Sequence, residues 1–358
     1  MINVTKTFLP SFEEYLTTLK RAWDKQWITN NGELVLELEK RLKEYLGVND
    51  LLYASNGTVV LQIALKALGI TKEVITTPFS YVATTNAILW EGCQPVFADI
   101  DPQTLCIDAD KIEAAITKNT QAILATHVYG IPCNVERIQA IADKYNLKVI
   151  YDGAHAFGCF YKGRSLLSYG DISTCSFHAT KVFHTVEGGA IICNDPGIGK
   201  TSFLHRSFGH IGDEYYSVGI NAKNSEFHAA MGLVNLNHLD KILEQRKELS
   251  EYYDRKLSAA NITRPSRPDD LIYNHSYYPV IFETEERVLN VMKALQRISV
   301  NPRRYFYPSL NSLPFLKNKS TMPVSESISS RVLCLPLFTD LEKSDIDRIC
   351  EQVIKIQE

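Results

Sequence analysis

A single lysine stands between two histidines in the stretch SFHATKVFHTVEGGA, residues 176–190. Lys181 lies beyond a strand-like run and before the pair Gly188-Gly189, and its neighbours are largely apolar or aromatic. These surroundings do not suit a solvated surface charge. Because loss of water lowers the pKa of a lysine, its amine becomes available as a nucleophile or a base. Lys181 is therefore the first candidate catalytic residue.

An aspartate that ends an apolar run is the second candidate. In VIYDGAHAFG, residues 149–158, Asp152 directly follows three apolar residues, and His155 comes three positions later. A buried carboxylate is costly unless a cation or a hydrogen-bond donor meets it. A surface turn would explain both residues, but an aspartate in this place is better suited to binding a protonated ring nitrogen.

Two further motifs follow strand-like runs. SNGT, residues 55–58, precedes a helical pattern, so the amides of Gly57 and Thr58 would lie at a helix N-terminus, which favours a phosphate. In PFSYVATTNAI, residues 78–88, Tyr81 begins another helix, where its ring could lie on a flat cofactor. Taken alone, the first motif would be an ordinary helix cap and Tyr81 an ordinary core residue.

Together these residues fit one cofactor, pyridoxal 5′-phosphate. The phosphate would bind the two residues of SNGT together with Ser176, which shares its strand with the lysine motif. Tyr81 would stack on the ring, and Asp152 would keep the pyridine nitrogen protonated so that the ring acts as an electron sink. Lys181 would form the Schiff base and, once the substrate amine has displaced it, move the proton between substrate and cofactor.

The candidate residues need elements that bring them together. Short runs rich in valine and isoleucine alternate with helical patterns from about residue 50 to residue 195, which predicts a mostly parallel sheet covered by helices. Catalytic residues should gather at the carboxyl ends of such strands. Residues 226–256 are predicted to form one long helix, followed by a shorter α+β pattern. We therefore predict a large α/β domain over residues 1–245 and a small α+β domain over residues 246–358.

Composition argues against several other classes of protein. The chain of 358 residues has a formal net charge of −3, which gives no electrostatic basis for binding nucleic acid or an anionic membrane. Neither a secretory signal nor a membrane-spanning window is evident, so we expect a cytoplasmic protein. The eight cysteines are scattered without a C-x-x-C pair, which favours buried thiols over disulfides, and no metal site is expected.

One stretch imitates a phosphate-binding P-loop. NDPGIGKT, residues 194–201, ends in the right letters, but Asn194 replaces the required glycine and Pro196 removes an amide from the loop. An ATPase is therefore not expected. A dinucleotide-dependent dehydrogenase is not expected either, because no G-x-G-x-x-G opens a helix after the first strand.

The ordered motifs resemble a known family over nearly the whole chain. They are SNGTVVLQIALKAL, TTPFSYVATTNAI, PVFADID, THVYGIP, YDGAHAFG, SFHATKVFHTVEGGAI, GINAKNSEFHAAMG and RRYFYP. This series resembles the DegT/DnrJ/EryC1/StrS family of sugar aminotransferases, which share the aspartate aminotransferase fold, fold type I of the pyridoxal phosphate enzymes. The resemblance implies a homodimer with shared active sites, in which Asn221 reaches the cofactor phosphate of the partner subunit. It places His155 near the ring hydroxyl, and the presence of Lys181 instead of histidine implies transamination instead of dehydration.

Two segments bear on the substrate. WITNNG, residues 27–32, is similar to the segment W-[LIV]-T-N-N-G-P of enzymes that aminate C4 of dTDP-4-keto-6-deoxy-glucose, which implies that sugar as acceptor and L-glutamate as the usual donor. The family also places the RRYFYP loop near the nucleotide-sugar. C3 amination, another nucleotide carrier and a non-catalytic regulatory protein that binds the cofactor remain alternatives. The substrate-binding candidates are Thr29, Asn30, Asn31, Arg303, Arg304 and Tyr307.

Overall fold

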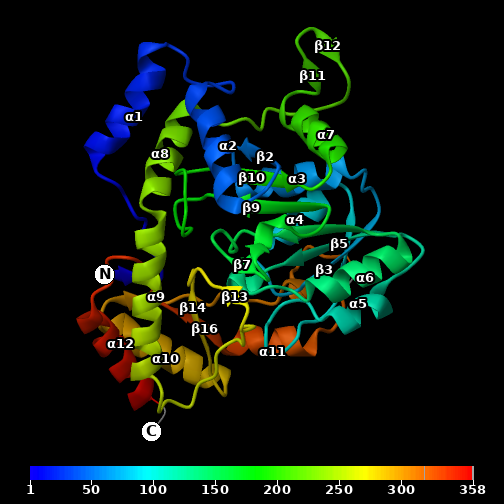
Figure 1. Cartoon of the computed structure of the whole chain (residues 1–358). Coiled ribbons are helices and arrows are strands. Elements are labelled where there is room, and N and C mark those ends of the chain that lie inside the picture. The colour runs from blue at the N-terminus through cyan, green and yellow to red at the C-terminus, as the bar shows by residue number, and fades with distance from the viewer. Residues whose placement is uncertain (318, 357–358) are drawn as a thin grey trace.

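A seven-stranded sheet forms the centre of the computed structural model, which describes residues 1–317 and 319–356 (Figure 1). Strand β10 is antiparallel to both of its neighbours, and every other pair of adjacent strands is parallel. The mostly parallel α/β sheet predicted from the sequence is therefore confirmed. In spatial order the strands are β2 (Asp50–Ala54), β10 (Gly189–Cys193), β9 (Ile172–Ser176), β6 (Lys148–Asp152), β5 (Thr120–Thr126), β3 (Glu73–Thr76) and β4 (Gln94–Phe97).

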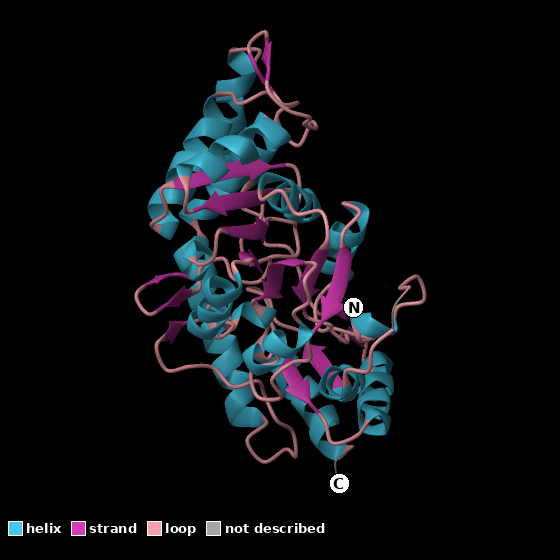
Figure 2. Ribbon diagram, turned by 90° about the vertical axis from the view of Figure 1, so that its right-hand side faces the viewer, coloured by secondary structure: helices cyan, strands magenta, loops and turns pink. Residues whose placement is uncertain are grey.

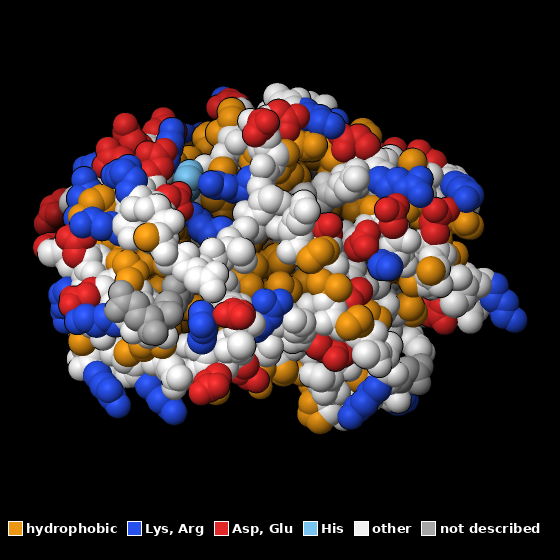
Figure 3. Space-filling view, turned by 90° about the horizontal axis from the view of Figure 1, so that it is seen from below, with side chains coloured by type: hydrophobic (Ala, Val, Ile, Leu, Met, Phe, Trp, Pro, Cys, Tyr) orange, Lys and Arg blue, Asp and Glu red, His pale blue; other side chains and the backbone are white. Residues whose placement is uncertain are grey.

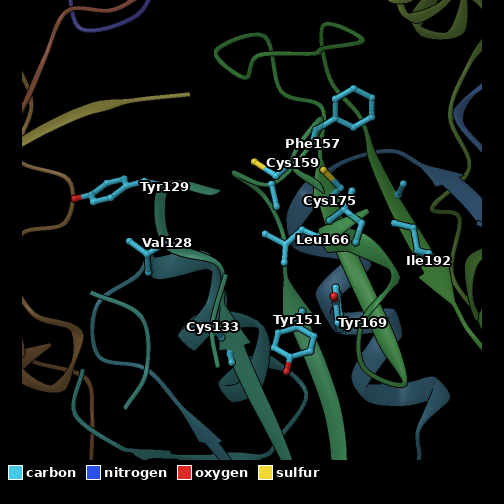
Figure 4. Packing of buried hydrophobic residues seen from close by; sticks show 14 of the residues in the cluster. Val128, Tyr129, Cys133, Tyr151, Phe157, Cys159, Leu166, Tyr169, Cys175 and Ile192 are labelled. Carbon is cyan, nitrogen blue, oxygen red and sulfur yellow. The ribbon is translucent and has the colours of Figure 1, made fainter. Parts of the chain in front are cut away.

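Helices cover both faces of this sheet (Figure 2). Successive side chains of a strand point to opposite faces, and in β6 Val149 and Tyr151 join one hydrophobic core whereas Ile150 joins the other. Figure 4 shows Tyr151 in the larger core with Tyr169 and Cys175. The covering helices are α2 (Glu33–Leu46), α3 (Gly57–Ala67), α4 (Val82–Trp90), α5 (Ala109–Ala115), α6 (Val135–Tyr145), α7 (Pro196–Arg206) and α8 (Glu226–Asn237).

The predicted long helix is two consecutive helices, because α8 ends at Asn237 and α9 (Leu239–Lys256) begins after His238. The first turns of α9 pack into the larger core through Ile242, and its later turns pack through Tyr253 into a third core. Residue 245 thus lies inside a continuous helix that contacts two cores. The domain boundary at that residue stays a prediction.

The third core lies toward the C-terminal end of the chain (Figure 1). Antiparallel strands β14 and β16 form a small sheet there, which packs against helices. The elements of this region are β14 (Tyr278–Ile281), α10 (Glu285–Arg297), β15 (Val300–Asn301), α11 (Pro323–Arg331), β16 (Val332–Leu335) and α12 (Lys343–Lys355).

Several short elements lie outside these cores. The strands β11 (His210–Ile211) and β12 (Glu214–Tyr215) form a hairpin that projects from the molecule (Figure 1). Tyr215 and Val218 at this hairpin are 79% and 87% exposed. The remaining elements are β1 (Ile2–Asn3), α1 (Phe12–Asp24), β7 (Phe160–Tyr161), β8 (Arg164–Ser165), β13 (Leu271–Ile272) and three short 3-10 helices (Val128–Gly130, Leu166–Ser168, Leu310–Ser312).

The surface and the thiols can be compared with the predictions from composition. Acidic and basic side chains are interspersed over the face shown in Figure 3. All eight cysteines are free and buried, as predicted. Within residues 1–317 and 319–356, no helix is both long and apolar enough to cross a membrane.

The P-loop-like stretch forms the start of α7. The Asp195 side chain caps this helix by accepting hydrogen bonds from the Gly197 and Ile198 amides, at 2.7 and 3.0 Å. A Cβ atom on Gly199 would lie 1.6 Å from a carboxylate oxygen of Asp50. Two carboxylates therefore occupy the place where a P-loop would bind phosphate, and negative charge is repelled there.

Candidate active site

The parallel strands bring the predicted residues to one edge of the sheet. Asp152 is the last residue of β6 and Ser176 the last residue of β9, and the loop that carries Lys181 leaves the same end of β9. Gly57 begins α3 directly after β2, which runs in the same direction. The carboxyl ends of the strands therefore form the site, as the alternating pattern predicts.

Asp152 is 5% exposed, and two donors satisfy its carboxylate. The Thr84 hydroxyl donates to Oδ2 at 2.7 Å, and the Ala154 amide donates to Oδ1 at 3.0 Å. The Thr84 hydroxyl in turn lies 2.7 Å from the hydroxyl of Ser80. These bonds stabilise the buried carboxylate, which forms no ion pair within residues 1–317 and 319–356, so it is suited to a positively charged ring nitrogen.

Thr84 was not predicted as a site residue. It lies three positions after Tyr81 in α4, so the two residues are neighbours on one face of the helix. This spacing is the signal in the sequence that would have indicated it. Tyr81 itself is the N-cap of α4 and is 57% exposed, so its ring is available to a ligand instead of being buried in the core.

Because Gly57 has no side chain, Ser176 packs directly against its backbone. A Cβ atom on Gly57 would lie 2.6 Å from Cβ and 2.8 Å from Oγ of Ser176. The Thr58 amide, which was predicted to bind phosphate, already donates to the Asn56 side chain at 3.0 Å. The Thr58 hydroxyl, the Ser176 hydroxyl and the Gly57 amide remain as groups for an anion at this helix N-terminus.

Lys181 lies at the wall of a cavity between the sheet and the C-terminal part of the chain. The cavity is lined by Ala154, His155, Ser176, Asn274, Ser276 and Tyr277, among others. Burial lowers the pKa of the Lys181 amine, and the negative charge of Asp152 partly opposes this shift. The amine is therefore closer to its neutral, reactive form than an exposed lysine would be.

His155 is buried against the RRYFYP segment. Its Nδ1 accepts a hydrogen bond from the Tyr129 amide at 3.1 Å, and its ring stacks on Phe306 with centroids 5.6 Å apart. Burial, together with the charge of Lys181, holds the pKa of His155 well below its usual value. The ring is therefore neutral, with Nε2 left to donate a hydrogen bond.

The segment 274–277 contributes residues that the sequence did not indicate. Asn274 donates to the backbone oxygens of His155 and Phe157, at 2.8 Å each. Ser276 donates to the backbone oxygen of Tyr129 at 3.0 Å. These bonds fix a distant segment against the loops of the site, but no local motif marks it.

None of the predicted substrate residues is among the residues that line the Lys181 cavity. The guanidinium of Arg304 pairs with Glu285 at 2.7 Å and lies 3.5 Å from the ring centroid of Tyr307, so contacts within the chain already occupy it. The Arg303 guanidinium lies over the Tyr305 ring, 5.1 Å from its centroid, and Arg303 is exposed.

The WITNNG loop and Asn221 also lie at the surface. Thr29 and Asn30 are exposed, and the Asn31 side-chain oxygen accepts a long hydrogen bond of 3.5 Å from Arg206. Asn221 is exposed too, and its side-chain oxygen accepts from Lys223 Nζ at 2.9 Å. A second subunit could therefore reach all four residues.

The residues present fit pyridoxal phosphate. The Gly57 amide and the Ser176 hydroxyl, which lie close together at the N-terminus of α3, suit its phosphate, and the buried, hydrogen-bonded Asp152 carboxylate suits its ring nitrogen. The amine of Lys181, which burial shifts toward its neutral form, suits its aldehyde.

Comparison with known proteins agrees with this fit. The model of the DegT/DnrJ/EryC1/StrS aminotransferase family matches residues 11–354. A dTDP-4-amino-4,6-dideoxy-D-glucose transaminase of Shigella dysenteriae is 41% identical over 368 residues, which cover 99% of each chain. The crystal structure of DesI in the presence of its TDP-sugar product has a TM-score of 0.94 and 33% identity, and covers 99% of this chain and 92% of DesI. The PLP form of the sugar aminotransferase Spr1654 from Streptococcus pneumoniae has a TM-score of 0.90 and 25% identity, with 98% and 97% covered.

Proposed function

The chain belongs to the DegT/DnrJ/EryC1/StrS aminotransferase family, and from this premise we propose that it moves the amino group of L-glutamate to C4 of dTDP-4-keto-6-deoxy-D-glucose. It is a pyridoxal phosphate-dependent aminotransferase. The products would be 2-oxoglutarate and dTDP-4-amino-4,6-dideoxy-D-glucose. The observation that carries the choice of sugar is the full-length identity of 41% with a transaminase of that name.

The residues of this chain have separate tasks in the proposed reaction. When bound, pyridoxal phosphate supplies an electron sink beside the carbon that loses its proton. Asp152 holds a proton on the ring nitrogen, and Gly57, Thr58 and Ser176 bind the phosphate. Lys181 Nζ takes the proton from Cα of glutamate in the first half-reaction and delivers a proton to C4 of the sugar in the second. The amino group and two electrons that glutamate loses are those that the sugar gains, so no outside oxidant is needed.

The first experiment is the visible spectrum of the purified protein loaded with cofactor. We expect L-glutamate to remove the absorption band of the bound cofactor, and dTDP-4-keto-6-deoxy-D-glucose to restore it as the amino sugar forms. Mass analysis of the sugar nucleotide and NMR of its ring protons would establish amination at C4 and the gluco configuration.

Three other results would each change the conclusion. A band that responds to glutamate but not to this sugar would replace the substrate with another nucleotide keto-sugar, such as one aminated at C3. A band that responds to no amino donor would favour the non-catalytic regulatory protein. Failure to bind the cofactor at all would contradict the site.

The shared active site is a further part of the proposal. Asn221 is exposed beside the projecting hairpin, and Tyr215 and Val218 give that hairpin a large apolar surface. Exposed apolar surface of this kind suits a subunit contact. We propose a homodimer in which Asn221 reaches the cofactor phosphate of the partner subunit.

A mixing experiment tests this arrangement. The variants Lys181→Ala and Asn221→Ala are each expected to have low activity as homodimers, because each lacks a group at both sites. After exchange of equal amounts, half of the dimers carry one intact site out of two, so activity should return to about a quarter of the wild-type value. No recovery, with subunit exchange verified by native mass spectrometry, would show that both groups of a site come from one chain.

The proposed product indicates the cellular compartment and the kind of pathway in which the protein acts. A dTDP-linked amino sugar is a donor for building O-antigen or a related polysaccharide, and the nucleotide-sugar precursors of such polymers are made in the cytoplasm. We place the protein there and in that kind of pathway. Accumulation of unaminated keto-sugar nucleotide in cells that lack the protein would support both assignments.

A further inference from the structure

A buried carboxylate binds the backbone directly after the WITNNG loop. Glu226, the first residue of α8, is 0% exposed. Its two carboxylate oxygens accept hydrogen bonds from the Leu34 and Val35 amides, at 2.7 and 3.1 Å, which are donors in the first turn of α2. These amides need an acceptor because Gly32, the N-cap of α2, has no side chain to cap them.

The backbone of Glu226 holds the other end of the same loop. Its amide donates to the Ile28 oxygen at 3.0 Å. A Cβ atom on Gly32 would lie 2.6 Å from Cδ of Glu226, so only glycine leaves room for the carboxylate. One residue thus fixes the loop before Thr29 and after Asn31.

Two positions earlier, Asn224 binds the Lys181 side of the site. Its side-chain amide donates to the Glu187 oxygen at 2.9 Å, just after the lysine loop, and to the Tyr53 hydroxyl at 3.0 Å. It also donates to the Ala54 oxygen at 3.3 Å, at the end of the strand that leads to Gly57. The short segment 224–226 therefore contacts both the cofactor-binding part of the chain and the WITNNG loop.

We propose that Glu226 is a positioning residue for the sugar substrate, which holds Thr29, Asn30 and Asn31 in a binding conformation relative to the rest of the chain. This inference rests on the proposed function, in which that loop binds the keto-sugar. L-Glutamate does not need the loop in this scheme, so loss of the carboxylate should affect one half-reaction and spare the other.

The test compares Glu226→Ala with the wild-type holoenzyme. KM for dTDP-4-keto-6-deoxy-D-glucose should rise about tenfold or more, while the rate at which L-glutamate removes the cofactor band changes by less than about twofold. Hydrogen exchange followed by mass spectrometry should become faster at residues 26–36 in the protein with and without cofactor. Glu226→Gln retains one acceptor and should give an intermediate KM, which keeps the test open if the alanine variant does not fold.

The control is Glu248→Ala, which removes an exposed carboxylate from α9. It should leave KM and hydrogen exchange unchanged. Equal losses in both half-reactions, or faster exchange at the loop with an unchanged KM, would overturn the proposal. If the wild type aminates a different keto-sugar, KM is measured for that sugar, so a wrong substrate assignment is distinguished from a wrong role for Glu226.

Discussion

Replacement of Lys181 by alanine is expected to lower kcat/KM for transamination by about a thousandfold or more, because the variant lacks both the attachment point of the cofactor and the group that moves the proton. In addition, borohydride reduction should attach the cofactor permanently to the wild-type chain but not to the variant. Intact-mass spectrometry measures this difference without any turnover.

The fold should survive this change. Within the described part of the chain, the Lys181 amine makes no hydrogen bond or ion pair that alanine would remove, and burial already disfavours its charge, as its lowered pKa shows. We therefore expect a melting temperature within about 3 °C of the wild-type apoprotein. The matched control is Lys200→Ala, which removes the exposed lysine of the P-loop-like stretch and should leave activity unchanged.

Full steady-state activity of Lys181→Ala would contradict the assignment of this residue as base and cofactor anchor. If Lys200→Ala lost activity and the wild type released phosphate from a nucleotide, the results would instead support a P-loop in this stretch. The carboxylates of Asp195 and Asp50 around that helix start make this second result unexpected.

The sequence was sufficient to predict the site residues that lie at the carboxyl ends of the parallel strands. Asp152 and Ser176 end neighbouring parallel strands, so their proximity follows from the pattern of apolar runs and from the rule that sites form at the carboxyl ends of such strands. Helix propensity could not reveal the break at His238, because both halves of residues 226–256 are favourable helical sequence. Leu233 of α8 and Ile242 of α9 pack into the same larger core, so the break at His238 does not coincide with the change of core, which lies farther along α9.

Contacts between distant segments could not be predicted in the same way. Asn274 and Ser276 reach the site from a segment more than a hundred residues after the loops they contact, and a hydrogen bond over that distance leaves no local pattern. The prediction for the Thr58 amide failed for a local reason, because the Asn56 side chain competes with an anion for this donor. Asn56 is a strong N-cap, and its side chain takes the amide that an anion was expected to bind.

Replacement of Asp152 by asparagine is expected to lower kcat/KM about a hundredfold or more. A neutral amide cannot stabilise a proton on the ring nitrogen as a buried carboxylate does, so the electron sink is weakened in both half-reactions. This loss in both halves distinguishes Asp152 from Glu226, whose removal should affect only the sugar half. Stopped-flow absorbance with L-glutamate alone measures the first half-reaction.

Asparagine should preserve the hydrogen bonds that hold the fold in this place. Its side-chain oxygen can still accept from the Ala154 amide, and the Thr84 hydroxyl can turn to accept from the new amide group while it donates to Ser80. The melting temperature of the apoprotein should therefore change little. Thr84→Val, which removes one donor and keeps the charge, should lower activity only about tenfold.

Asp143→Asn supplies the matched control, because it makes the same chemical change on the exposed face of α6. It should leave both half-reactions at the wild-type rate. If Asp152→Asn kept the wild-type rate with glutamate, the ring nitrogen would not depend on this carboxylate, and the orientation of the cofactor in the site would have to be reversed. A loss with Thr84→Val as large as that with Asp152→Asn would show that the hydrogen-bonded position of the carboxylate, and not only its charge, determines the rate.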